Sequence, residues 1–185
     1  MTKKTLIAIT AVVLVLFCTV GATLAWLVAT TGEVKNTFTY GNINITLAET
    51  TTSYKMIPGG TISKDPKVTV KANSEACWLF VKVTESDNFD TFMTYAIADG
   101  WTQLTDDRTP AVPVSGVYYR EVAASTTDTA YSVLKDDQVK VESSVTKSQF
   151  DNLTETTKPT LTFKAYAIQQ EGFTTAYAAW TEASK

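Results

Sequence analysis

Short segments in which apolar and polar residues alternate recur along the chain, and turn residues separate them. The clearest are KVTVKA from Lys67, CWLFVKVT from Cys77 and LTFKAYAIQ from Leu161. A period of two residues puts every second side chain on one face of a β-strand, so each segment has a face that needs a core. Many short strands divided by turns are typical of an antiparallel β-sandwich, either jelly-roll or immunoglobulin-like. We therefore expect an all-β fold.

The segment that begins at Cys77 predicts a central strand, because both of its faces are apolar. One face carries Cys77, Leu79, Val81 and Val83, and the other begins with Trp78 and Phe80. Pro58 followed by Gly59-Gly60 predicts a turn before the strand KVTVKA, in which Val68 and Val70 point inward. Further short strands are expected in MTYAIA, WTQL, GVYYREV, YSVL and QVKVE, divided by DGW, TDDRTPAVPVSG, ASTTDTA and KDD.

Two segments near the C-terminus predict helical structure. TKSQFDNL, from Thr146, is compatible with a single helical turn. The last residues change from a period of two to a helical period, since Phe173, Ala176, Tyr177 and Trp180 follow an i, i+3, i+4, i+7 spacing. Thr174 or Thr175 can cap the start. We expect a short C-terminal helix that is docked by its aromatic side chains.

The first strand region, TFTYGNINITL from Thr37, contains a change of phase. Phe38 and Tyr40 share one parity, and the later apolar residues Ile43, Ile45 and Leu47 share the other. The change falls at Gly41-Asn42, so we expect a bulge or a break in the strand at these two residues.

The N-terminus has the pattern of an export signal. Lys3 and Lys4 precede an uncharged span from Leu6 to Ala29, and small residues follow its most apolar part. Cleavage between Ala25 and Trp26 would make residues 1–25 a signal peptide with a hydrophobic leader helix, and cleavage after Ala22 is the next candidate. The same span is long enough to remain as an uncleaved membrane anchor.

The composition excludes several classes of function. The chain of 185 residues has a net charge of −3, and removal of the two leader lysines leaves 14 basic against 19 acidic residues, or −5. This balance, without a basic stripe, excludes a nucleic-acid partner. The absence of histidine excludes His-based catalytic triads and HExxH zinc sites. We expect no enzymatic activity and no cofactor.

Three weaker patterns have a structural and a functional interpretation. Cys77 is favoured as a small buried side chain over a nucleophile, because no histidine can activate it. Trp101, Tyr118 and Tyr119 are favoured as packing residues over a sugar-binding face. The loop carboxylates that could bind calcium weakly lack EF-hand spacing, and solvated turns are the favoured interpretation: Asp87, Asp90, Asp106, Asp107, Asp136 and Asp137.

The beginning of the chain resembles the TasA/camelysin family of exported Gram-positive proteins, which are processed by the signal peptidase SipW. The shared features are a leader that ends in GATLA, a polar spacer, and then Asn36-Thr37-Phe38, Gly41 and an alternating apolar strand. A Pro58-Gly59 turn followed by Lys64-Asp65 and KVTVKA is also similar. The resemblance covers residues 1–85 best. Camelysin-type relatives have been classed as metalloproteases, and this chain lacks the residues for that activity.

The resemblance implies a jelly-roll β-sandwich and a role as a subunit of extracellular biofilm fibres. Such fibres form by donor-strand exchange, in which the N-terminal segment of one subunit completes a sheet of the next. Here residues 26–40 would be the arm and residues 41–185 the sandwich domain. The candidate donor side chains are Trp26, Leu27, Val28, Val34, Phe38 and Tyr40.

We therefore expect a protein that is secreted, or bound to the surface, of a Gram-positive bacterium. Its partners would be further copies of itself or related matrix subunits, together with the signal peptidase during export. The membrane would be contacted only through the leader. The alternative is a cell-surface binding module, an adhesin or carbohydrate binder, which an uncleaved leader would anchor.

Overall fold

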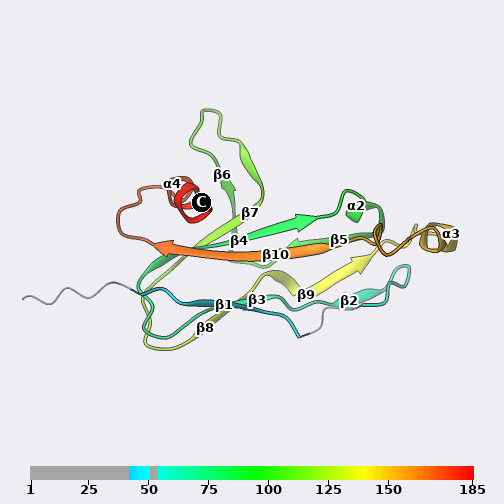
Figure 1. The fold of residues 1–185 in the computed structure, drawn as a ribbon, viewed down its shortest axis with the longest axis horizontal. Coiled ribbons are helices and arrows are strands. Elements are labelled where there is room, and N and C mark those ends of the chain that lie inside the picture. Colours follow the sequence, from blue (N-terminus) through cyan, green and yellow to red (C-terminus); the bar gives the residue numbers. More distant parts are fainter. Residues whose placement is uncertain (1–41, 51–53) are drawn as a thin grey trace, which may run out of the picture. The chain divides into compact units, whose positions relative to one another are not determined.

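The computed structural model describes residues 42–50 and 54–185, which belong to one unit, residues 40–185, and are mostly β-structure. All strand pairs are antiparallel (Figure 1). The largest sheet has the order β10-β4-β7-β6. Its strands are β10 (Leu161–Gln169), β4 (Cys77–Glu85), β7 (Pro113–Val122) and β6 (Thr102–Thr105).

Two three-stranded sheets face this large sheet, and their strands alternate along the sequence. One has the order β1-β3-β8, with β1 (Ile45–Ala48), β3 (Lys67–Val70) and β8 (Thr129–Ser132). The other has the order β2-β9-β5, with β2 (Thr61–Ser63), β9 (Leu134–Val141) and β5 (Met93–Ile97). Val133, between β8 and β9, bridges them: its N–H donates to Pro66 O, next to β3, and its carbonyl accepts from Ala98 N, next to β5, so the two sheets act as one layer.

The core lies between the two layers and contains the face of β4 that the alternation predicts. Cys77, Leu79 and Val81 are fully buried, and they pack with the fully buried Val68 of β3. β4 is central, since it pairs with β10 on one side and β7 on the other. Its opposite face is also covered, because Trp78 and Phe80 are buried beneath helix α4 (Ala176–Ala183). The prediction of a central strand covered on both faces is confirmed.

The short helices lie at the ends of the strands and on the outer face of the large sheet. The Thr175 hydroxyl caps α4 by accepting from Ala178 N, and the buried Trp180 packs on Phe80. Helix α3 (Lys147–Asp151) begins with a capping box in which Thr146 and Gln149 bond each other's backbone. Helical structure is therefore confirmed in both predicted segments, although Phe173 precedes the first residue of α4. A further helical turn, α2 (Phe89–Phe92), has no counterpart in the predictions.

Two strands, β7 and β9, include residues that the sequence predicts to be in loops. β7 begins at Pro113, and Gly116 within it has a φ of 67°, a conformation that glycine adopts at little cost. From there the β6–β7 hairpin projects away from the sheet (Figure 1). β9 continues through Asp136 and Asp137, whose φ angles are 56° and 53°. The loop expected at residues 135–137 is wrong, and the one expected at residues 105–116 is correct only for residues 106–112, because a locally distorted strand tolerates proline, glycine and aspartate.

The first strand is shorter than TFTYGNINITL. It begins at Ile45, and Ile43 packs on the core without being part of a strand. The leader, the arm and Gly41 lie outside the described residues, so the expected leader helix and phase change stay predictions. Among residues 42–50 and 54–185, no helix has the length and apolar character needed to cross a membrane.

Candidate functional site

β10 differs from every other strand that ends a sheet. The six edge strands are β1, β8, β10, β6, β2 and β5. Most have three to five residues, and β5 and β6 also carry irregularities of register. β10 has nine residues and pairs with β4 without interruption. Natural sheets usually shorten, bulge or cover their edges, so a long regular edge is an available surface for pairing.

The register shows which backbone groups of β10 point outward. Ser86 N donates to Thr160 O at 3.0 Å and Gln170 N donates to Ala76 O at 2.9 Å, so even-numbered residues of β10 face β4. The odd-numbered residues turn their N–H and C=O groups the other way. These outward groups have no hydrogen-bond partner among the described residues; they belong to Leu161, Phe163, Ala165, Ala167 and Gln169.

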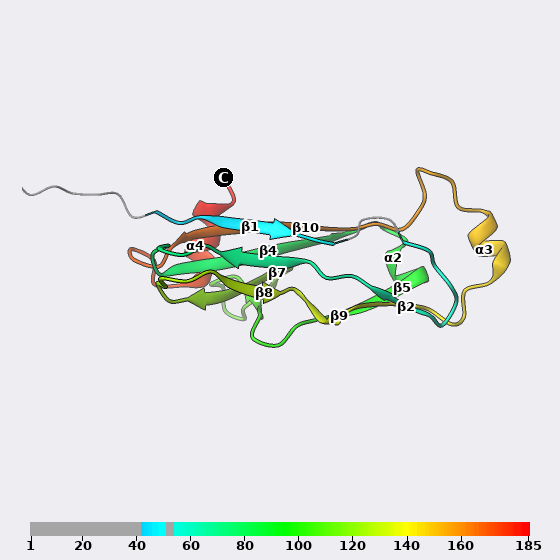
Figure 2. The same ribbon diagram turned by 90° about the horizontal axis from the view of Figure 1, so that it is seen from below.

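The facing layer has a second open edge on the same side. β1 and β10 lie at one side of the two layers (Figure 2). β1 pairs with β3 only and does not extend along β2. Because Lys64 N bonds Asp137 O, the backbone groups of Thr61 and Ser63 face away from β9. Considering residues 42–50 and 54–185, an added strand would therefore meet unpaired groups on both layers.

A groove with an apolar floor runs between these two edges, and we call it the edge groove. Its larger hollow has a volume of about 530 Å³, and its apolar lining residues are Met56, Ile62, Phe89, Met93, Val139 and Leu161. A smaller hollow of about 280 Å³ lies beside Leu47, Pro66 and Phe163. Both hollows share Leu161 and Thr162. Phe163 and Leu161, which the sequence predicts to point inward, are only partly buried at this edge.

A polar cluster lies between the two hollows. The Lys64 ammonium forms an ion pair with Glu49 at 2.6 Å, although its side chain is only 12% exposed. Tyr54 donates its hydroxyl to the same carboxylate at 2.5 Å. The ammonium also lies over the rings of Tyr54, at 5.0 Å, and Phe163, at 5.4 Å. Burial, followed by the bond to Glu49, raises the pKa of Tyr54.

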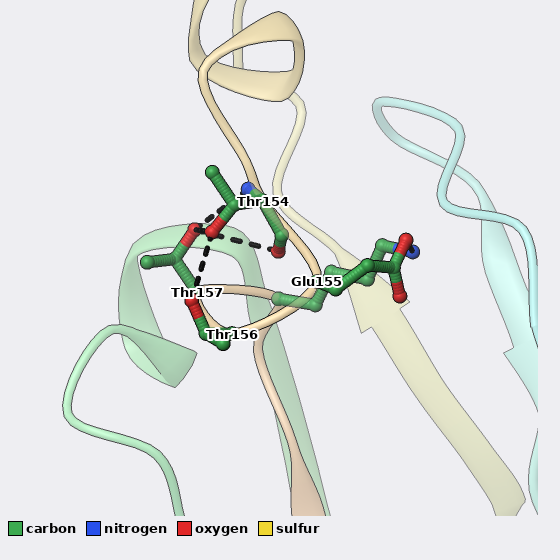
Figure 3. Close-up of polar contacts among 5 residues, drawn as sticks. Thr154, Glu155, Thr156 and Thr157 are labelled. Carbon is green, nitrogen blue, oxygen red and sulfur yellow. Dashed lines mark hydrogen bonds and ion pairs between the residues drawn. The ribbon is translucent and has the colours of Figure 1, made fainter.

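A rigid turn forms the rim of the larger hollow. Thr154 N donates to the Thr157 hydroxyl at 2.8 Å, and Thr157 O accepts from the Asn88 side chain at 2.8 Å. Figure 3 shows the threonine hydroxyls turned toward one another, with Glu155 pointing away from them. Glu155 pairs with Lys158 at 2.6 Å, and both line the hollow. Local hydrogen bonds therefore hold the shape of this rim.

The residues with alternative chemical interpretations have structural roles. Cys77 is fully buried, and burial raises the pKa of its thiol to about 11, which suits a packing residue and not a nucleophile. Trp101 is 9% exposed and donates Nε1 to Ser132 O at 2.8 Å. Tyr119 packs against Trp78. Neither ring is an open platform for a sugar, so the favoured packing interpretation is confirmed for both.

The acidic residues of the loops do not converge. Asp106 is buried and holds the hairpin loop by accepting from Val112 N at 2.8 Å and from the Arg108 side chain. These bonds, that from Val112 first, keep the pKa of Asp106 below its usual value. In residues 42–50 and 54–185, no group of three or more acidic or cysteine side chains could hold a metal ion.

Most residues of the predicted site lie outside the described part of the chain. These are the cleavage residues Ala25 and Trp26, the donor residues Leu27, Val28, Val34, Phe38 and Tyr40, and Gly41. Asn42 is described; it lies before β1, and its carbonyl accepts from Glu75 N at 3.1 Å. What the structure adds is the edge groove, which no sequence pattern predicted.

Comparisons of the chain with models of protein families, with curated proteins and with solved structures find no match. The function therefore has to be argued from the residues and from the geometry of the edge groove.

Proposed function

We propose that the protein is a secreted structural subunit of extracellular fibres with a jelly-roll sandwich, and that the edge groove receives the N-terminal arm of another copy. The observation that carries the proposal is the nine-residue edge of β10, which is unpaired among the described residues and whose first residues, Leu161 to Phe163, line an apolar groove. An extended segment in this place satisfies backbone groups and buries side chains together.

The arm has suitable length and composition for such a groove. Residues 26–40 would span roughly 50 Å when extended, whereas β10 would span about 30 Å. The arm can therefore cover the edge and still leave a short linker to its own subunit. Val34, Phe38 and Tyr40 share one parity and supply apolar side chains for one face.

The direction of the contact favours a fibre over a closed particle. The arm of one subunit and the groove of the next are different surfaces, so the contact is head-to-tail. A growing chain of subunits therefore keeps one free arm at one of its ends and one free groove at the other. Repetition of this contact produces a filament unless its rotation closes a ring.

Electron microscopy of the purified mature protein, with and without residues 26–36, tests the role of the arm. We expect fibres only when the arm is present. Equal fibre formation by both forms, or no fibres from either under any condition, would refute the proposal.

A substitution in β10 tests the acceptor edge. Ala165→Pro removes an N–H that points outward and leaves the β4 ladder intact, and proline is tolerated in edge strands. Ala130→Pro is the matched control, because Ala130 N faces outward on β8 in the same way. Ala165→Pro should prevent fibre growth and Ala130→Pro should not. Equal effects would show that β10 has no special role.

A further inference from the structure

Lys64 crosses the edge groove and joins the two layers. It follows β2 in one layer, and its ammonium lies 5.4 Å from the centroid of the Phe163 ring on β10 in the other. Its partner Glu49 follows β1, and the Glu49 side chain is 17% exposed. One ammonium thus holds together the ends of β1 and β2 and the edge of β10.

The position of this cluster conflicts with an added strand. Lys64 and Tyr54 line the larger hollow, whereas Glu49 and Phe163 line the smaller one. A segment that pairs along β10 from Leu161 past Phe163 would place side chains where the Lys64 stem lies. The side chains of the arriving segment and the Lys64 stem cannot occupy the same closely packed space, so the Lys64 side chain must move.

We propose that Glu49, Tyr54 and Lys64 form a latch that blocks the edge groove between its two hollows in the isolated subunit and slows strand addition. This inference rests on the proposed function and concerns the regulation of the same groove. When the latch opens, Lys64 turns to solvent and the Phe163 ring becomes a contact for the arriving segment. A latch of this kind prevents premature association through the open β10 edge.

Lys64→Met tests the latch, since methionine keeps an unbranched apolar stem and removes the charge. The ion pair and both ring contacts are lost, so the groove opens at lower cost. We expect fibre elongation about fivefold faster, the size of effect that one partly buried ion pair supports. Lys67→Met is the matched control, because Lys67 forms a more exposed pair with Asp137 at 3.4 Å in the same part of the layer.

Glu49→Gln provides an independent variant that leaves Lys64 in place without its counter-charge. It should accelerate elongation in the same direction as Lys64→Met, and the double variant should add little to either. Melting temperatures of all variants report whether the fold survives, and if Lys64→Met does not fold, Glu49→Gln decides. Light scattering and electron microscopy of the mature protein give the rates.

The outcomes separate the latch from the proposed function. Faster growth of both variants with unchanged growth of Lys67→Met supports the latch. Unchanged growth would overturn it, and slower growth would also overturn it by showing that Lys64 binds the arriving segment. If the unsubstituted mature protein forms no fibres, the proposed function fails and the latch has no role.

Discussion

Gly116 gives the sharpest test of the packing between β4 and β7. A Cβ atom built on this residue would lie 2.2 Å from Val83 O, a backbone atom of the neighbouring strand. Because that oxygen cannot rotate away, Gly116→Ala requires the strands to separate by about 1 Å, given ordinary contact distances. The substitution also places alanine at a φ of 67°, which costs an L-residue roughly 1–2 kcal/mol.

The expected loss of unfolding free energy has two parts: the cost of placing alanine at a positive φ, and the cost of weakened hydrogen bonds between β4 and β7. One or two weakened backbone hydrogen bonds add roughly 1–3 kcal/mol. We therefore expect Gly116→Ala to lower the free energy of unfolding by about 3–4 kcal/mol. For a domain of this size the melting temperature should fall by roughly 10 °C.

Gly172→Ala is the matched control. Gly172 has a φ of 91°, but nothing lies within 4 Å of a Cβ atom built on it. This variant isolates the backbone cost, and we expect a loss of about 1 kcal/mol. Urea unfolding followed by far-UV circular dichroism, under conditions in which the protein sediments as a monomer, measures both. Losses that agree within about 0.5 kcal/mol would refute the argument from the Val83 contact, since typical additivity errors are of that size.

Three other predictions concern buried groups. The pKa of Cys77 is raised to about 11 from an ordinary 9.0, so the thiol ionises in the unfolded chain before it ionises in the folded one. The free energy of unfolding should therefore fall as pH rises from about 9 to 11. Cys77→Ala should reduce this slope in unfolding titrations. The pKa of Asp106 is lowered mainly by the bond from Val112 N, so its stabilisation is present above an ordinary pKa of 3.8 and is lost as pH falls below it; Asp106→Asn should flatten that acid limb of the unfolding curve. Trp180→Ala removes the anchor of α4 and should cost roughly 3–5 kcal/mol in chemical unfolding, with retention of the sheet signal in circular dichroism.

The strands and helices that the sequence predicted correctly are those whose apolar periodicity can be recognised within a single segment of the chain. β4 has apolar residues on both faces, and β10 has alternation over nine residues, so both are found without knowledge of their neighbours. The start of α4 was predictable because Thr175 and the aromatic spacing agree. In each case local preference and tertiary packing favour the same structure.

The predictions fail where tertiary contacts override a local signal. Pro113 and Gly116 suggest a loop, yet hydrogen bonds to β6 and β4 hold this stretch in a strand. Asp136 and Asp137 suggest a turn, but they form an irregular part of β9 whose ends are paired with β2 and β5. Single-sequence patterns contain no information on these neighbours.

The edge groove belongs to the same category, because its parts come from distant segments. Phe163 on β10 meets Lys64 and Glu49, which precede it by about a hundred residues. The sequence signalled Phe163 as an inward residue and Lys64-Asp65 as a shared feature of the resemblance. Neither signal shows that the inward side chain lies at an open edge, or that the lysine reaches across to it. Only the register of the sheets reveals this.

The open β10 edge could also be satisfied by a second copy of β10, and that possibility predicts a different particle. Such a contact would use one surface twice and would form a closed dimer. It would pair the outward groups of β10 but would not fill the edge groove, because each strand remains attached to its own sheet. A free arm can pair with the outward backbone groups of β10 and also fill the edge groove, so it gains hydrogen bonds and apolar burial together. The protein without residues 26–36 should therefore sediment as a monomer; a dimer that Ala165→Pro abolishes would show instead that β10 pairs with itself.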